Sequence, residues 1–211
     1  MAFNQIARKS EIEELFWQMQ VEVYAGQVDD TFGVGIEPLE TLTTESVLNM
    51  LDYKSGRYSI EKPILLGAKL AGMSQEKLEL LSKIGLKVGL VFQIVDDILG
   101  LFGKVEVTGK SNTSDIIEAK RTLLVTKTYA KATSHQQVRI KSILGNKDLT
   151  QEEADWFKNL VIETGVLAEL TNFCKEEITT TKTLILQNFS PENQGTKFLI
   201  ELCDYMVSRE L

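Results

Sequence analysis

The feature that most constrains the fold is an apolar segment near the middle of the chain, GLVFQIVDDILGLFG at residues 89–103. It belongs to a longer stretch, from about Ser74 to Phe102, in which apolar residues recur every three or four positions. This spacing is typical of an α-helix. Because residues 88–102 are apolar nearly all the way round, they predict a central helix rather than a surface one. The apolar positions are Leu78, Leu81, Ile84, Val88, Val91, Val95, Ile98 and Phe102.

The rest of the chain also predicts helices. Helical spacing extends over residues 11–33, and a break, GVGIEP, follows. Thr44 is expected to cap a helix that reaches the Lys54–Gly56 region, and PILLGAKLAG is expected to form the next one. Thr150 and Glu153 have the spacing of a capping box. After a loop over residues 103–114, further helices are expected at 115–133, 135–145, 150–164, 166–187 and 193–209.

Together these patterns predict an all-α fold, a helical bundle built as a single domain over residues 1–211. Only three prolines occur, so long helices are possible. No segment alternates convincingly as a β-strand, and no internal repeat or linker is evident.

Composition excludes several functions. The formal net charge of -7 and the lack of a basic run argue against broad nucleic-acid binding. No signal peptide or membrane span is evident, so we expect a cytoplasmic protein. Cys174 and Cys203 are far apart and are expected to be reduced, buried thiols. His135 is the only histidine, which excludes a histidine-based triad or zinc site.

Asp96 and Asp97 are unusual because they lie side by side within the apolar segment. A buried carboxylate is costly unless a cation or a polar cavity offsets its charge, and a second one beside it raises the cost. Gln93 precedes them by three and four residues and can share their side of the helix. Oxygen ligands without histidine or cysteine indicate magnesium. Alternatively, both aspartates face solvent near the helix end.

Cationic residues nearby extend this pattern. Lys110 lies in the glycine-containing loop, Lys120 and Arg121 follow it, and Lys54 lies in the sequence KSG. Carboxylates for a metal, cations for phosphate and an apolar interior suit a ligand with a diphosphate head and a hydrocarbon tail.

Each of these residues also has a purely structural explanation. Asp115 and Glu118 have capping-box spacing and would then only start a helix. Lys120 and Arg121 would form a solvated face, and Lys54 would complement a helix dipole.

The segment FQIVDDILGLFGKVEVTGKSNTSDIIEAKRTLLV resembles the second aspartate-rich region of the trans-isoprenyl diphosphate synthases, the polyprenyl synthetase family. GQVDD at 26–30, YKSGRYSIEKPILLGAKLAG, IETGVLAEL and the terminal LCDYMVSREL resemble other family segments in order and spacing. The resemblance covers the chain from about Glu11. It implies the isoprenoid-synthase fold without its N-terminal helices, and it corresponds to the C-terminal two-thirds of the family fold.

The resemblance also implies roles for individual residues. Asp96 and Asp97 would be magnesium ligands and, with Lys54, the catalytic residues. Phe92 would line the prenyl pocket, and Gln93 would contact the allylic substrate. The residues implied to bind the allylic diphosphate are Lys54, Ser55, Lys110 and Lys120.

This sequence departs from the family pattern at three points. Gly100 replaces the usual third aspartate of the motif, and Ser55 replaces a common threonine. The larger departure is the first aspartate-rich motif, for which residues 1–25 offer no counterpart. The chain would therefore be a fragment or truncated product, or it would work without that motif.

The implied activity is the magnesium-dependent condensation of an allylic diphosphate with isopentenyl diphosphate, impaired in this chain alone. An alternative is a non-catalytic subunit that pairs with a complete synthase, and a third is a helical interaction protein unrelated to prenyl chemistry. The implied assembly is a homodimer, or a heterodimer with a complete synthase. The sequence does not indicate the product chain length.

Overall fold

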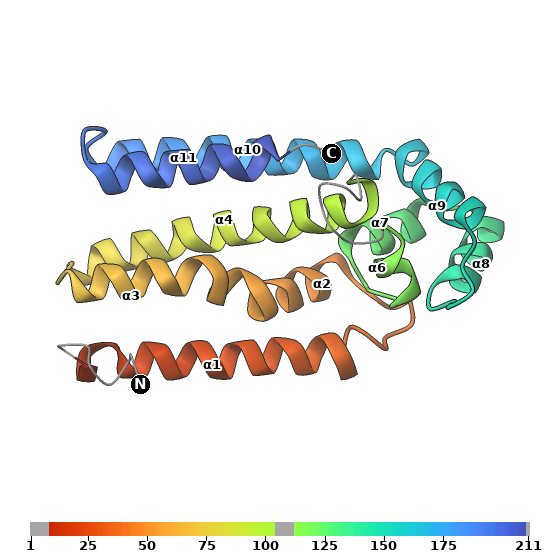
Figure 1. The fold of residues 1–211 in the computed structure, drawn as a ribbon, viewed down its shortest axis with the longest axis horizontal. Helices are drawn as coiled ribbons and strands as arrows, with labels where there is room; N and C mark the ends of the chain where they lie inside the picture. Colours follow the sequence, from red (N-terminus) through yellow and green to blue (C-terminus); the bar gives the residue numbers. More distant parts are fainter. Residues whose placement is uncertain (1–8, 104–111, 210–211) are drawn as a thin grey trace.

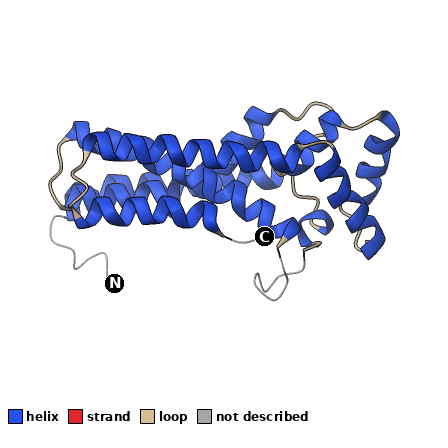
Figure 2. Cartoon of the chain, turned by 90° about the horizontal axis from the view of Figure 1, so that it is seen from above, coloured by secondary structure: helices blue, strands red, loops and turns tan. Residues whose placement is uncertain are grey.

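The structure, a computed structural model, describes residues 9–103 and 112–209. Its regular elements are all helical, and no strand occurs among these residues, which confirms the all-α prediction. Figure 1 shows the long helices lying along the longest axis, with the short helices between residues 114 and 163 gathered at one end. The view from above, in Figure 2, shows the same elongated arrangement. No described helix is both long and apolar enough to cross a membrane.

Helix α4, Gln75–Phe102, is the central helix that the sequence predicts. Ser74 caps it by accepting a hydrogen bond from the Lys77 amide. It packs against five other elements: η2 (Asp52–Glu61), α3 (Lys62–Leu70), α7 (Leu123–Lys131), α10 (Val166–Asn188) and α11 (Gln194–Ser208). Its buried residues include Ile84 and Val91, both fully buried. Burying each such side chain stabilises the fold by about 1.5–3 kcal/mol. Two of the other long helices, α10 and α11, pack directly against α4.

Helix α1, Lys9–Phe32, packs one face against η2 and α3. Its Ile12 is 2% exposed. The opposite face carries a stripe of apolar side chains that are 58–71% exposed. This stripe, called the α1 stripe below, consists of Trp17, Val21, Tyr24, Val28 and Phe32.

Residues 44–70 form one continuous helical segment whose middle part is a π-helix. Helix α2, Thr44–Leu51, passes into the π-helix η2, Asp52–Glu61, and then into α3, Lys62–Leu70. The cap of α2 is Thr43, which forms a capping box with Ser46, so the prediction that Thr44 is the cap was wrong by one residue. Only Thr43 has the extended backbone that lets its hydroxyl reach the amide of Ser46.

Two glycines allow η2 to lie close to its neighbours. A Cβ atom on Gly26 of α1 would lie 2.2 Å from the backbone nitrogen of Lys54. A Cβ atom on Gly89 of α4 would lie 2.5 Å from the carbonyl oxygen of Gly56. Because neither glycine has a side chain, η2 can pack closely between α1 and α4. This close packing fixes the position of Lys54.

A buried charge cluster joins α1, η2 and α3. Lys62 is 3% exposed, and its Nζ lies 3.1 Å from a carboxylate oxygen of Glu22 and 3.1 Å from one of Glu61. Arg57 also pairs with Glu22, and Ser82 of α4 donates a hydrogen bond to Glu61. Buried charges are tolerated when they are paired in this way.

The predicted helix over residues 115–133 was wrong. Helix α6, Ser114–Ile117, is a single turn, and the next helix, α7, spans Leu123–Lys131. Ala119, between them, has a φ of 54°, a left-handed conformation that cannot continue a right-handed helix. Lys120 and Arg121 therefore lie in the connection between two helices and not one turn inside a helix.

The remaining helices agree with the predicted ranges to within a few residues. They are α8, Ser134–Ile143; α9, Gln151–Glu163; α10, Val166–Asn188; and α11, Gln194–Ser208. The capping box of Thr150 and Glu153 at the start of α9 is confirmed. Cys174 and Cys203 are buried free thiols, as expected.

Candidate functional site

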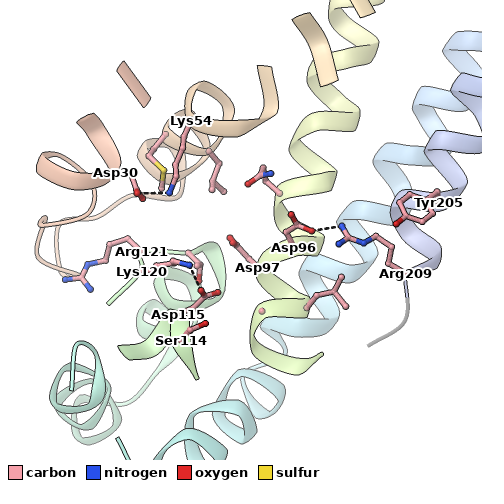
Figure 3. Close-up of a pocket in the computed structure, with 16 residues that line it drawn as sticks. Asp30, Lys54, Asp96, Asp97, Ser114, Asp115, Lys120, Arg121, Tyr205 and Arg209 are labelled. Carbon is pink, nitrogen blue, oxygen red and sulfur yellow. Dashed lines mark hydrogen bonds and ion pairs between the residues drawn. The ribbon is translucent and has the colours of Figure 1, made fainter. Parts of the chain in front are cut away.

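A cavity of about 590 Å³ lies where the C-terminal part of α4 meets η2, the α6–α7 connection and the end of α11. Figure 3 shows its charged side chains reaching in from all of these elements. Part of its wall is apolar and includes Met50, Leu51 and Leu99. Four acidic and four basic residues also line it. They are Asp30, Asp96, Asp97, Asp115, Lys54, Lys120, Arg121 and Arg209.

The two adjacent aspartates of α4 point in different directions. In Figure 3 the side chain of Asp97 extends towards Lys120 and Asp115, whereas that of Asp96 extends towards Arg209. Consecutive side chains on a helix diverge in this way because each residue turns by about 100°. Both line the cavity, so the alternative that they simply face solvent at the helix end is not what the structure has.

Among the described residues, Asp97 has no counter-charge in direct contact. Its Oδ2 is buried and accepts no hydrogen bond within the described structure. Burial raises the pKa of Asp97 to about 8, and the charges of Asp115 and Asp96 add to this rise. Lys120 and Lys54 oppose it without cancelling it. The cavity therefore contains one carboxylate that a bound cation would stabilise.

Most cations of the cavity are already neutralised by carboxylates. The ion pairs are Lys54–Asp30, Lys120–Asp115 and Arg209–Asp96. Arg121 instead donates to the backbone carbonyls of Glu37 and Ala119, and burial lowers its pKa. An anionic ligand that uses these lysines would have to exchange with the aspartates.

Gly100 explains one departure from the family pattern. A Cβ atom at this position would lie 2.6 Å from Oδ2 of Asp115. The space that a third aspartate of the motif would need is thus occupied by a carboxylate from α6. Asp115 was considered as part of a capping box, but its side chain forms an ion pair with Lys120.

The structure brings together most of the residues that the sequence singled out. Asp96, Asp97, Gln93, Lys54 and Lys120 all line the cavity.

Two predicted site residues are not among the residues that line it. Ser55 lies on η2 and its carbonyl accepts a hydrogen bond from Ser59. Phe92 lies beneath the guanidinium of Arg209, with 5.4 Å between Cζ and the ring centroid. Lys110 lies outside the described residues.

Sequence reasoning missed several residues of the cavity. Asp30 was noted only as part of GQVDD, although its Oδ2 lies 2.6 Å from Nζ of Lys54. Arg209 and Tyr205 carry no local signal, because they reach the cavity only when α11 packs beside α4.

The residues present fit a divalent cation. Asp97 offers a buried carboxylate oxygen without a partner, and Asp96 is adjacent to it. No group of three or more potential acidic, histidine or cysteine ligands occurs in the described part of the chain. Magnesium usually binds one or two carboxylates and completes its shell with water and substrate phosphate.

The fold and the cavity define an all-α protein with a site suited to a divalent cation and a phosphate-type anion. The chain belongs to the polyprenyl synthetase family, whose model, described as "Polyprenyl synthetase", matches residues 1–161.

Individual relatives agree with this assignment. A short chain isoprenyl diphosphate synthase of Methanocaldococcus jannaschii is 34% identical over 143 residues, which cover 68% of this chain and 42% of the relative. A geranylgeranyl diphosphate synthase of Methanosarcina mazei is 32% identical over 191 residues, or 90% of this chain and 55% of the relative. The chain thus spans about half the length of these proteins.

A solved structure has the same fold. Geranylgeranyl pyrophosphate synthase from Corynebacterium glutamicum, complexed with isoprenyl diphosphate and magnesium, superposes with a TM-score of 0.84 and 25% sequence identity. The match covers 95% of this chain and 56% of that one.

Proposed function

We propose that this chain is a magnesium-dependent prenyltransferase of isoprenoid biosynthesis, which condenses an allylic diphosphate with isopentenyl diphosphate. The observation that carries the proposal is the cavity with the unpartnered carboxylate of Asp97 facing Lys54 and Lys120. Membership of the family and the ligands of the C. glutamicum structure support it. The single domain over residues 1–211 and a cytoplasmic location remain predictions.

In this proposal Asp96 and Asp97 hold magnesium, and Lys54 and Lys120 bind the diphosphate. Bound magnesium would neutralise the diphosphate and stabilise the charge that develops on it as it departs. Lys54 donates N–H groups to phosphate oxygens once its ion pair with Asp30 has opened. Lys120 does the same once its ion pair with Asp115 has opened.

The rest of the reaction takes place on the substrates. Breaking the bond between carbon and oxygen leaves an allylic cation and pyrophosphate. The double bond of isopentenyl diphosphate then attacks the cation, and one proton is lost to restore a double bond. The apolar wall formed by Met50, Leu51 and Leu99 keeps water from the cation.

We expect this chain alone to bind diphosphates weakly and to turn over slowly. The family resemblance implies a first aspartate-rich motif that faces the second one across the cavity, and this sequence has no DDxxD segment. A heterodimer with a complete synthase would add a chain that has this motif, whereas a homodimer would add only a second copy of the same residues.

The test is a condensation assay with isopentenyl diphosphate, a series of allylic diphosphates and magnesium, alone and with a complete synthase. Asp97→Asn should abolish the product that wild type forms. Asp204→Asn is the matched control, because Asp204 pairs with Lys182 on the surface and is not among the residues that line the cavity. Product formation that Asp97→Asn leaves unchanged would contradict the proposal.

A second candidate function is that of a non-catalytic subunit paired with a complete synthase. The observation that favours it is the α1 stripe, whose side chains are 58–71% exposed on a helix that belongs to the bundle. Wild-type product levels in mixtures containing Asp97→Asn would indicate this function, because the chain would then act without its own aspartates.

A further inference from the structure

The ion pair between Arg209 and Asp96 connects the end of α11 to the candidate metal site. Nη1 of Arg209 donates to Oδ1 of Asp96, which lies 113 residues earlier in the chain. The Asp96 side chain is 37% exposed and that of Arg209 is 25% exposed. The same guanidinium lies over the ring of Phe92, one turn before Asp96 on α4. Arg209 is therefore held at a defined position on the wall of the cavity.

We propose that Arg209 is a positioning residue that competes with the divalent cation for Asp96, so that metal binding and the Arg209–Asp96 ion pair oppose each other. The inference rests on the proposed metal-binding role of Asp96. It assigns to the C-terminal end of α11 a control over metal affinity that neither the family match nor the relatives' names describe.

The charges of the cavity support this competition. The ion pair occupies one of the two carboxylate oxygens of Asp96. A divalent cation on the other oxygen would lie close to the positive guanidinium and would be repelled by it. The neighbouring Asp97 has no such competitor, because its Oδ2 accepts no hydrogen bond within the described structure. Asp97 therefore has a carboxylate oxygen available for a cation, whereas one carboxylate oxygen of Asp96 is occupied by Arg209.

Release of Arg209 requires only a side-chain movement. Arg209 follows the last residue of α11, and the nearby Met206 and Cys203 anchor that helix in the core. The side chain is long and its four single bonds can rotate, so it can leave Asp96 while the helix stays packed. Metal binding should then loosen the last residues of α11 without unfolding the helix.

The primary test measures Mn²⁺ binding to the full chain without substrate, from the electron paramagnetic resonance signal of the free ion. Arg209→Gln should bind Mn²⁺ roughly two- to fivefold more tightly than wild type, the range expected for losing one partly exposed ion pair. Arg209→Lys keeps the charge and should stay close to wild type. Arg139→Gln is the matched control, because Arg139 also stacks on an aromatic ring, at 4.2 Å from Trp156, but does not line the cavity.

A double-mutant comparison separates competition from a general structural effect. In an Asp96→Asn background, Arg209→Gln should change Mn²⁺ affinity by less than about twofold, because the shared partner is gone. Hydrogen exchange gives an independent readout. Amides at residues 205–209 should exchange faster when Mn²⁺ is added to wild type, and this acceleration should be absent in Asp96→Asn.

Equal or weaker Mn²⁺ binding by Arg209→Gln would overturn the competition. The proposed function would survive that result if magnesium-dependent binding of inorganic pyrophosphate were still lost in Asp97→Asn. If neither wild type nor Arg209→Gln bound metal, with or without pyrophosphate, both the competition and the proposed function would fall.

Discussion

Asp97 is a single residue whose environment lowers the stability of the fold. Its carboxylate is buried on a helix whose other faces are packed, and its pKa is raised to about 8 mainly by that burial. A structural role would be better served by a neutral side chain. Residues whose environment costs free energy are typical of functional sites, where a ligand compensates for that cost.

Asp97→Asn should therefore stabilise the metal-free protein. At about pH 9, above the raised pKa, we expect a gain of about 1–2 kcal/mol, because the buried charge is removed. The gain should shrink as the pH falls from about 8 towards the ordinary pKa of an aspartate, since the wild-type carboxyl is then protonated in the folded state. Urea denaturation in the presence of a chelator would measure it.

The control is Asp204→Asn, whose effect on the free energy of unfolding should be near zero, because the Asp204 side chain is 57% exposed. A loss of stability in Asp97→Asn at high pH would show that Asp97 makes a favourable contact in the folded protein.

At the scale of elements, the position of η2 depends on close approach between backbones. Gly89 lets the carbonyl of Gly56 approach α4, and Gly26 lets Lys54 approach α1. The π-helix thereby presents Lys54 to the cavity from a segment that is held on two sides.

Gly89→Ala should destabilise the fold by about 1–3 kcal/mol, because its Cβ would have to displace backbone atoms of Gly56. Gly67→Ala in α3 should be neutral or stabilising by up to about 1 kcal/mol, since nothing lies within 4 Å of that Cβ. Thermal unfolding of the two variants gives the comparison. Equal effects would mean that the contact between η2 and α4 is looser than described.

Lys62→Met should be among the most damaging single changes in the bundle. It would leave the carboxylates of Glu22 and Glu61 without their shared cation, at an expected cost of about 3–5 kcal/mol. Lys182→Met removes a pair with Asp204 on the surface and should cost about 0–1 kcal/mol. Chemical denaturation measures the loss of unfolding free energy in both variants. Similar losses would contradict the prediction that the buried ion pairs of Lys62 matter more than an exposed pair.

The elements that sequence could predict are those with a long, regular apolar pattern. Helix α4 and its neighbours follow from that spacing, and Asp96 and Asp97 are conspicuous because they interrupt it. The break at Ala119 could not be predicted, because its left-handed conformation depends on tertiary contacts, such as the hydrogen bond from the Gly145 amide to the carbonyl of Ile116. The π-helix depends in the same way on packing against α1 and α4.

At the scale of the whole molecule, the α1 stripe is the largest departure from an ordinary bundle. Exposed apolar side chains are common singly, but an aligned set along one helix is typical of an interaction surface. The cavity also draws on the whole molecule, since its residues come from segments as distant as Asp30 and Arg209. No local pattern could have predicted that Arg209 lies beside Asp96.

We expect the chain to associate through the α1 stripe, with itself or with a complete synthase. The double substitution Val21→Glu with Val28→Glu should lower the mass measured by light scattering at a given protein concentration, because both side chains are exposed within the stripe. Val138→Glu on α8 is the control, since Val138 is 65% exposed but isolated from the stripe. A mass that neither variant changes would place any association on another surface.

The balance of acidic and basic residues around the cavity has a kinetic consequence. Four carboxylates and four cations face the same space, and the chain carries a formal net charge of -7. The molecule therefore exerts little long-range attraction on a free diphosphate, whose negative charges it tends to repel. A diphosphate that arrives already complexed with magnesium carries less charge and meets less repulsion. The rate of capture should accordingly depend weakly on ionic strength and strongly on the fraction of diphosphate that is complexed before the encounter.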